Sequence, residues 1–347
     1  MHILFGILNW GLGHATRTEP LIREAESRGR KVTIATWGSS LKYLQARFPQ
    51  ANFIDLQGPD IRYGSHVLLS VQLLFQAFAD AGFPSRIRSL VREVHKKDPI
   101  HRVFSDNLPW MDIPGARSVY MTHQLNIPTP RLLRWVNGFH RRWMSRFDEI
   151  WVPDRMIEPR LSGRLSKVER KDIQPRYVGW LSRWEGKVEA SGDHLLILLS
   201  GPEPARTQLE RKLIRLLSNE KMILIRGVEG DLEDGPEKWE IHGRLGVDSM
   251  QPLLARSKGV IARSGYSTLM DLIVIGVPAI LIPTPGQTEQ EYLADHLKRL
   301  DWFEIIRESD LENLDLERAK NPNLSMQKGD LADPAELLSL LESKGES

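Results

Sequence analysis

Short apolar runs alternate with amphipathic stretches along this chain, and the alternation starts once in each half. The first series opens with the apolar run Ile3–Leu8, a glycine-rich loop and a helical pattern over Ala15–Arg28, which Gly29 closes. The apolar run Val32–Thr36 follows directly. Strand, helix and strand in this order are typical of a βαβ unit, in which helices cover a parallel sheet. The sequence therefore predicts an α/β fold.

The series begins again after a polar, basic stretch over residues 161–176, and this break predicts two consecutive α/β domains. The length of 347 residues suffices for both. We expect the first domain at residues 1–180, the second at 181–330 and a final helix within 331–347. Asp333, Pro334 and Glu336 offer that helix an N-cap, a proline at its first position and a glutamate for a capping box. The other expected elements are strands at Phe53–Leu56, His101–Ser105, Ser118–Thr122, Glu149–Val152, Leu195–Leu199, Met222–Ile225, Gly259–Ile261 and Ala279–Ile282, and helices at Arg206–Leu217 and Leu269–Ile275.

Composition excludes several classes of protein. No run of 18 apolar residues is present, which argues against a transmembrane helix. The N-terminus shows no basic region and no small-residue cleavage site, so we expect no secretory signal. The absence of cysteine excludes disulfides, thiolate metal sites and cysteine nucleophiles. A cytoplasmic enzyme is the expectation.

Charge is divided unevenly between the two halves. Residues 1–180 carry 27 Lys and Arg against 16 Asp and Glu, a net charge of +11, whereas residues 181–347 have a net charge of −9. The basic half suits an anionic surface or substrate, or it is a solvated basic face. Residues 131–147 hold five arginines, no acidic residue and a Trp, Phe and Leu face. This pattern predicts an interfacial helix at an anionic membrane, or a core-packing helix with a solvated basic face.

The loop Asn9–Thr16 lies between an expected strand and an expected helix. Its glycines, Gly11 and Gly13, allow backbone N–H groups to face an anion or a polar ligand. Thr16 occupies the third glycine position of a dinucleotide fingerprint, and no acidic residue ends the second strand, so the pattern argues against NAD. His14 lies at the mouth of the loop and suits general-base work, or it caps the following helix.

A second loop with these properties begins at Arg263. It follows the apolar run Gly259–Ile261 and opens a helix, where free N–H groups and the helix dipole attract phosphate. Asp271 lies one turn inside that helix, where a carboxylate can accept two hydrogen bonds from a ribose diol or compensate the dipole. A polar loop over residues 284–291 follows the next buried strand and is placed to contact a sugar. The loop that begins at Arg263 and the start of its helix contain the candidate phosphate-binding residues Arg263, Ser264, Gly265, Ser267 and Thr268.

This pattern resembles that of the MurG-type glycosyltransferases, which are family 28 and its relatives in the GT-B superfamily. The likeness is densest over residues 247–294, and the loop Gly11–His14 shows a weaker one. The matching positions are Asp248, Ser249, Met250, Ala262, Arg263, Ser264, Gly265, Thr268, Asp271, Gly276, Val277, Pro278, Gln290 and Glu291.

The resemblance implies two Rossmann-like domains that face each other across a cleft, with the final helix crossing back to the first. The C-terminal domain would bind a UDP-sugar such as UDP-GlcNAc, and the N-terminal domain would bind the acceptor. Transfer would invert the anomeric centre, with no metal and no cofactor beyond the donor. We expect no nucleic-acid partner, a peripheral position at the inner face of the membrane, and a lipid-linked or cell-envelope acceptor. The oligomeric state stays open.

Several residues take roles by this resemblance. Asp271 stands at a ribose-binding glutamate, and Val247 at a backbone amide that contacts uracil. Gln290 and Glu291 match a Gln-Gln pair that contacts the donor sugar, so Glu291 is a departure. Ser200 and Gly201 stand in a turn beside the diphosphate, where Pro202 removes one N–H donor. Arg183 matches an arginine that reaches the phosphate, following Gly179, and His14 matches a histidine near the reaction centre.

These residues suggest a chemistry. Because the sequence contains no Asp-x-Asp motif, the charge on the departing phosphate would be met by N–H groups, the helix dipole and Arg183 or Arg263. His14, or alternatively Asp106 or His123, would take the acceptor proton; the other interpretation of Asp106 and His123 is hydrogen bonding within their loops. The alternative functions are a UDP-sugar epimerase and a catalytically silent protein that binds a sugar nucleotide.

Overall fold

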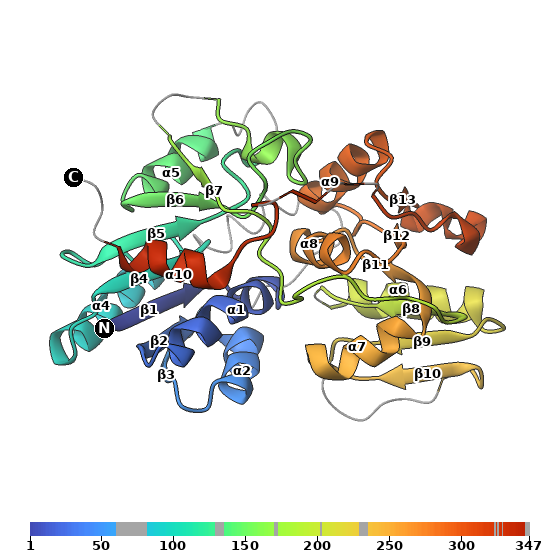
Figure 1. The fold of residues 1–347 in the computed structure, drawn as a ribbon, viewed down its shortest axis with the longest axis horizontal. Coiled ribbons are helices and arrows are strands. Elements are labelled where there is room, and N and C mark those ends of the chain that lie inside the picture. Colours follow the sequence, from blue (N-terminus) through green and yellow to red (C-terminus); the bar gives the residue numbers. More distant parts are fainter. Residues whose placement is uncertain are drawn as a thin grey trace. The chain divides into compact units, whose positions relative to one another are not determined.

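The computed structural model of the chain describes residues 1–59, 82–128, 135–169, 173–201, 203–228, 235–322, 324, 326–327 and 329–343. Its described residues form two compact units, each built on its own parallel sheet (Figure 1). Those before Arg183 and those from Met326 onward make up the first unit, and those of Arg183–Ser325 the second. Among the described residues, no helix is both long enough and apolar enough to span a bilayer.

In its described part, the first unit contains a seven-stranded sheet in the order β3-β2-β1-β4-β5-β6-β7. Every pair of neighbours in this sheet is parallel. The strands are β1 (His2–Ile7), β2 (Lys31–Thr36), β3 (Asn52–Asp55), β4 (Arg102–Asp106), β5 (Arg117–Met121), β6 (Glu149–Val152) and β7 (Arg176–Tyr177). The helices are α1 (Gly13–Ser27), α2 (Gly38–Arg47), α4 (Phe83–Lys97), α5 (Trp135–Met144) and α10 (Pro334–Glu342).

From Ile3 onward, strand β1 has no polar side chain because both faces of this sheet are covered. Ile3, Phe5 and Ile7 belong to one hydrophobic core, together with residues of α1 and α10. Leu4 belongs to a second core, on the other face, with residues of α4. Alternate side chains of a strand point to opposite faces, so an uninterrupted apolar run satisfies both cores.

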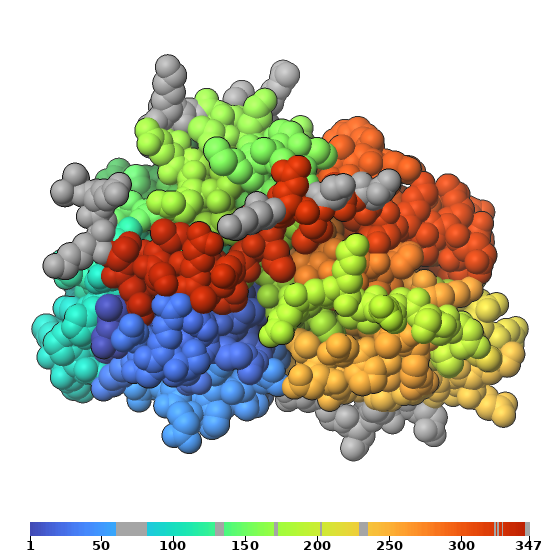
Figure 2. All heavy atoms as spheres, viewed as in Figure 1, coloured from blue at the N-terminus to red at the C-terminus, as the bar shows by residue number. Residues whose placement is uncertain are grey.

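The final helix α10 completes the first unit. The Asp333 side chain accepts a hydrogen bond from the backbone N–H of Ala335 at 2.8 Å, and Pro334 opens the helix. The N-cap and the proline predicted from the sequence are therefore confirmed. Leu337, Leu338 and Leu341 are buried in the core that also contains residues of α1. Figure 2 shows this helix, in red, lying on the blue N-terminal part of the chain.

The second unit contains a six-stranded parallel sheet in its described part, in the order β10-β9-β8-β11-β12-β13. Its strands are β8 (His194–Leu198), β9 (Met222–Ile225), β10 (Trp239–His242), β11 (Ser257–Ala262), β12 (Ala279–Leu281) and β13 (Glu304–Ile305). Its helices are α6 (Ala205–Leu217), α7 (Val247–Ala255), α8 (Tyr266–Ile275) and α9 (Thr288–Arg299). The structure therefore confirms the α/β class.

The expected and observed elements differ at a few places. Helix α8 begins at Tyr266, three residues earlier than expected, because Gly265 adopts an extended conformation and forms the N-cap. Asp106 is the last residue of β4, whereas the sequence placed it after the strand. Strands β7 and β13 have two residues each, too few to produce an alternating pattern in the sequence.

Each sheet has one point where its strand order reverses. In the first, β1 and β4 are neighbours, and Ile7 at the end of β1 pairs with Asp106. In the second, β8 and β11 are neighbours, and Leu198 pairs with Ala262. Ligands of open parallel sheets bind beyond the carboxyl ends of the strands at such points. These two places are therefore the candidate sites.

Candidate functional site

The start of α1 places a histidine against the end of β4. His14 is the second residue of α1, and its Nδ1 lies 3.0 Å from Oδ1 of Asp106. The Asp106 side chain is fully buried, and that of His14 is 12% exposed. Within the described part of the chain, no hydrogen-bond partner is present for Nε2 of His14. The pair resembles the histidine and carboxylate of acid–base sites.

Asp106 is held mainly by Arg17, a residue that the sequence analysis missed. Arg17 donates from Nε to Oδ2 of Asp106 at 2.7 Å, and from Nη2 to Oδ1. The hydroxyl of Thr18 donates to the same Oδ2 at 3.0 Å. Arg17 follows His14 by three residues on α1, so both side chains lie on one face of the helix. That spacing was the only signal in the sequence.

His123 joins this cluster from the loop after β5. It is buried, and its Nδ1 lies 3.4 Å from Nη1 of Arg17. The structure therefore brings together the three residues predicted to act in catalysis, His14, Asp106 and His123, around Arg17. We refer to these four residues as the His14 cluster.

Burial and charge set the protonation states in the cluster. Burial opposes the charge of Asp106, but Arg17 and His14 overcome it, so the pKa of that carboxyl lies well below its ordinary value. Burial lowers the pKa of His14 below 6.5; the negative charge of Asp106 opposes this shift, and the cation of Arg17 adds to it. Near pH 7, Asp106 is therefore ionised and His14 is neutral.

The glycine loop around the cluster is fixed by its own contacts. Gly11 has a φ of +78°, a conformation that L side chains rarely adopt, and Gly13 is the first residue of α1. Oδ1 of Asn9 accepts hydrogen bonds from the Ser40 backbone and the Ser39 hydroxyl, each at 3.0 Å. The loop is thereby joined to the start of α2.

In the second unit, the N-terminus of α8 faces an amide side chain from α9. Gln290 is 7% exposed, and its Oε1 accepts a hydrogen bond from the Thr284 backbone at 2.9 Å. A Cβ placed on Gly265 would lie 3.9 Å from both Nε2 of Gln290 and Oγ1 of Thr268. Because a backbone N–H only donates, the amide oxygen is fixed at Thr284, and the amide NH2 group faces Gly265.

Three residues that the sequence predicted to bind the donor line one pocket. Arg183, Thr268 and Asp271 lie around it, with Trp184. Nε of Arg183 donates to Oδ2 of Asp271 at 3.1 Å. Ser267 lies beside Thr268, in the first turn of α8.

Two residues of the expected phosphate motif point into the second unit instead. Arg263 is 1% exposed, and its guanidinium donates to Glu308 at 2.9 Å and to the backbone carbonyls of Ala205, Ile282 and Pro283. The Ser264 hydroxyl donates to the carbonyl of Gln290 at 3.0 Å. Their hydrogen-bonding groups join the loops at this edge of the sheet. This placement does not support a phosphate contact by the Arg263 side chain.

The other residues predicted to bind the sugar-nucleotide donor lie at the carboxyl edge of the same sheet. Val247 is the first residue of α7. Ser200 and Gly201 follow β8, and Gly201 has a φ of +97°. Pro202, which belongs to this turn, lies outside the described residues. Glu291 accepts a hydrogen bond from the Gly286 backbone at 2.9 Å, so the carboxylate that departs from the family pattern contacts the preceding loop.

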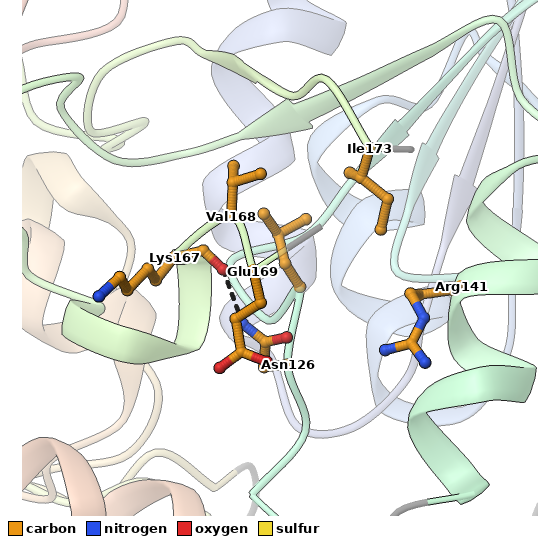
Figure 3. Close-up of a pocket in the computed structure, with 7 residues that line it drawn as sticks. Asn126, Arg141, Lys167, Val168, Glu169 and Ile173 are labelled. Carbon is orange, nitrogen blue, oxygen red and sulfur yellow. Dashed lines mark hydrogen bonds between the residues drawn. The ribbon is translucent and has the colours of Figure 1, made fainter. Parts of the chain in front are cut away.

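Helix α5 contains most of the segment predicted to meet a membrane. Residues 131–134 of that segment lie outside the described residues. Val136, His140 and Met144 are buried, whereas Trp135 and Phe139 are 52% and 48% exposed. Arg141 of α5 also lines a pocket with Asn126, Lys167 and Glu169, where Asn126 donates to the Lys167 carbonyl (Figure 3). One side of α5 therefore packs into the first unit, and two aromatic side chains face outward.

Sequence comparisons identify relatives of this chain. Residues 207–335 match the glycosyltransferase family 28 C-terminal domain. A UDP-N-acetylglucosamine–N-acetylmuramyl-(pentapeptide) pyrophosphoryl-undecaprenol N-acetylglucosamine transferase from Methylobacterium sp. (strain 4-46) is 25% identical, over 82% of this chain and 77% of the relative. An uncharacterized glycosyltransferase from Methanosarcina acetivorans is 26% identical, over 99% of this chain and 96% of the relative.

Solved structures show the same fold. MurG of Acinetobacter baumannii aligns with a TM-score of 0.58 at 12% identity, covering 98% of this chain and 99% of that one. The glycotransferase of kitacinnamycin aligns with a TM-score of 0.61 at 16% identity, covering 98% and 93%. The resemblance to MurG-type, family 28 glycosyltransferases is thus confirmed, and the chain is a glycosyltransferase of the GT-B fold with a family 28 C-terminal domain.

Proposed function

We propose that this glycosyltransferase moves a sugar from a UDP-sugar to an acceptor hydroxyl, with inversion and without a metal ion. The observation that carries the proposal is the contact between His14 and the buried Asp106 at the strand-order reversal of the first sheet. The name of the Methylobacterium relative supports UDP-GlcNAc as the first donor to test and a lipid-linked acceptor.

His14 is the best candidate for the base among the three that the sequence offered. Asp106 is buried, ionised and already accepts hydrogen bonds from Arg17, Thr18 and His14. Both ring nitrogens of His123 face donors, Nδ1 the guanidinium of Arg17 and Nε2 the amide nitrogen of Gln124, so the lone pair of that ring is occupied in either tautomer. His14 is neutral near pH 7, and its Nε2 has no hydrogen-bond partner among the described residues.

The proposed reaction is a single displacement. The acceptor oxygen attacks the anomeric carbon as its proton passes to Nε2 of His14, and the bond from that carbon to the phosphate oxygen breaks. UDP leaves with the bonding electrons. Because the acceptor attacks from the side opposite UDP, the configuration inverts.

The charge on the leaving phosphate would be met at the start of α8. The N–H groups there and the NH2 group of Gln290 are donors only, and together they favour an anion. Asp271 would bind the ribose, and Arg183, its ion-pair partner, lies within reach of the same ligand. These contacts supply the positive potential that a metal ion would otherwise provide.

The exposed aromatic face of α5 would bring the enzyme to an anionic membrane. Trp135 and Phe139 project from the helix, and Arg141 and Arg142 lie on the same helix. Aromatic rings at the lipid interface combined with arginines near anionic headgroups are typical of peripheral binding. The acceptor would then be a lipid-linked or cell-envelope molecule.

Release of UDP separates this proposal from the alternatives. The protein is incubated with UDP-GlcNAc and other UDP-sugars, with and without a cell lipid extract, and UDP and sugar products are measured. Release of UDP that depends on the extract is the expected result. Conversion of the donor sugar without UDP release would identify an epimerase, and binding without either reaction would identify a silent sugar-nucleotide-binding protein.

A further inference from the structure

Arg17 contacts the other three members of the His14 cluster, yet neither the sequence motifs nor the proposed displacement gives it a role. Its side chain is 1% exposed. We propose that Arg17 is a positioning residue that holds Asp106 by both oxygens and thereby fixes the proton of His14 on Nδ1. The catalytic consequence of this inference rests on the proposed function.

The guanidinium holds the carboxylate in a two-point contact. Nε meets Oδ2 at 2.7 Å, and Nη2 meets Oδ1, so each carboxylate oxygen accepts from a different nitrogen of the guanidinium fork. Oδ1 is thereby placed 3.0 Å from Nδ1 of His14. Lysine has the same charge but no fork, so it cannot fix both oxygens at once.

Arg17 also approaches the histidine directly, and the two contacts at Nδ1 compete. Nη2 of Arg17 and Oδ1 of Asp106 each lie 3.0 Å from Nδ1. A guanidinium only donates and an ionised carboxylate only accepts, so a single nitrogen cannot satisfy both. Nη2 already donates to Oδ1, and a lone pair on Nδ1 would face that negative oxygen. The proton therefore belongs on Nδ1, which leaves the lone pair on Nε2.

The charges that face His14 balance each other when the ring is neutral. Asp106 contributes a negative charge, Arg17 a positive charge, and His123 is a further titratable side chain that acts on it. A second proton on His14 would bring another positive charge close to Arg17 in a buried site. Burial already lowers the pKa of His14, and the cation of Arg17 lowers it further.

Two substitutions separate the geometry of Arg17 from its charge. Arg17→Lys keeps the charge and loses the fork, so kcat falls about 10- to 100-fold while the acidic limb of the pH–rate profile keeps its position. Arg17→Gln loses the charge, so kcat falls and the acidic limb also moves to higher pH, because Asp106 then favours protonated His14. In both variants, the KM for the donor stays near that of the unsubstituted protein.

The control is Arg23→Gln, which removes an exposed arginine from the same helix and leaves rate and profile unchanged. An unmoved acidic limb in Arg17→Gln would overturn the proposal, since a purely structural role lowers the rate without shifting the limb. Full activity in Arg17→Lys would overturn it as well. Thermal unfolding of each variant confirms that it is folded.

A spectroscopic measurement tests the inference without turnover and without substitution of Arg17. Nitrogen-15 NMR of the unsubstituted protein at neutral pH, with the His14 signals assigned by their loss in His14→Gln, reports which ring nitrogen carries the proton. We expect protonated Nδ1 and unprotonated Nε2. A proton on Nε2 would refute the role of Arg17. If this tautomer is found but no UDP-sugar is turned over, the proposed function fails and the inference about Arg17 stands.

Discussion

Nε of Arg183 lies 3.1 Å from Oδ2 of Asp271, so two residues with separate expected roles in donor binding are hydrogen-bonded to each other. Both side chains are mostly buried, at 12% and 14% exposure. The carboxylate is therefore held in one orientation at the pocket that Thr268 also lines. The hydroxyls of a diol bound there would donate to a carboxylate whose orientation is already fixed.

The first prediction concerns Asp271. Asp271→Ala removes the carboxylate proposed to bind the ribose, so we expect UDP to bind about 10- to 100-fold more weakly, because hydrogen bonds to charged groups contribute about 1.5–3 kcal/mol. Calorimetric titration with UDP measures the change. Asp295→Ala, which removes an exposed carboxylate on α9, serves as the control and leaves affinity unchanged. Equal affinity in the two variants would place the ribose elsewhere.

Replacement of His14 tests the proposal that this residue is the catalytic base. His14→Ala removes the proposed proton acceptor, so we expect kcat to fall by about 10²–10⁴-fold, while the Kd for UDP is retained. Initial rates and calorimetry provide the two measurements. His194→Gln, at a partly exposed histidine beside Asp193, is the control. Undiminished turnover in His14→Ala would exclude this residue as the base.

At Gln290, substitution by glutamate changes the charge of the side chain and leaves its shape nearly the same. In Gln290→Glu, one oxygen still accepts from the Thr284 backbone, but the other places a negative charge where the NH2 group faced the start of α8. We expect UDP affinity to fall at least about tenfold, because the donor diphosphate is then repelled. Thermal unfolding should change little. Gln208→Glu, on the exposed side of α6, is the matched control, and similar UDP affinity in both variants would contradict the prediction.

The pH dependence of stability depends on buried histidines. Burial lowers the pKa of His140 to about 4, and among the described residues its Nδ1 has no hydrogen-bond partner. A histidine with a folded pKa below its unfolded value of 6.5 is neutral in the fold and binds protons mainly when unfolded. Stability is therefore complete above pH 6.5 and falls as the pH drops from there toward 4.

His140→Phe removes this effect at one site. At pH 5, we expect the unsubstituted protein to have lost about 2 kcal/mol of unfolding free energy through His140 relative to pH 8. The variant should not show that part of the loss. Urea unfolding at both pH values measures the difference. Equal losses in the two proteins would show that His140 does not carry this proton linkage.

The proposed membrane binding rests on the outward aromatic residues of α5. Trp135→Ser combined with Phe139→Ser removes the exposed apolar area, so co-sedimentation with vesicles that contain anionic lipid should fall strongly. Leu216→Ser, at an exposed leucine of α6 in the second unit, is the control. If the unsubstituted protein does not bind such vesicles at low salt, the membrane proposal is wrong.

Much of the fold follows from local patterns in the sequence. The central strands, such as β1 and β8, are largely apolar runs because both faces of each sheet are covered. The N-cap of α10 was evident from Asp333 and Pro334. In contrast, β13 has only two residues and pairs with β12, so no local sequence pattern predicts it.

Arginine placement was harder to predict because its partners are distant in the sequence. Arg263 was expected to face a ligand, but Glu308, 45 residues later, and three carbonyl groups hold its guanidinium inside the unit. Arg17 was overlooked, although Asp106, 89 residues away, draws it into the site. In each case the fold supplies the counter-charge, and no window of the sequence contains both members of the pair.

The position of α10 has a consequence for biosynthesis. Its three buried leucines fill a core whose other members come largely from the first half of the chain. Until the ribosome has translated α10, its leucines are missing from that core, whereas all residues of the second unit precede α10 in the sequence. Of the two units, the one whose synthesis begins first is thus completed last, and its apolar core stays open on one face of the nascent chain until α10 has been synthesised.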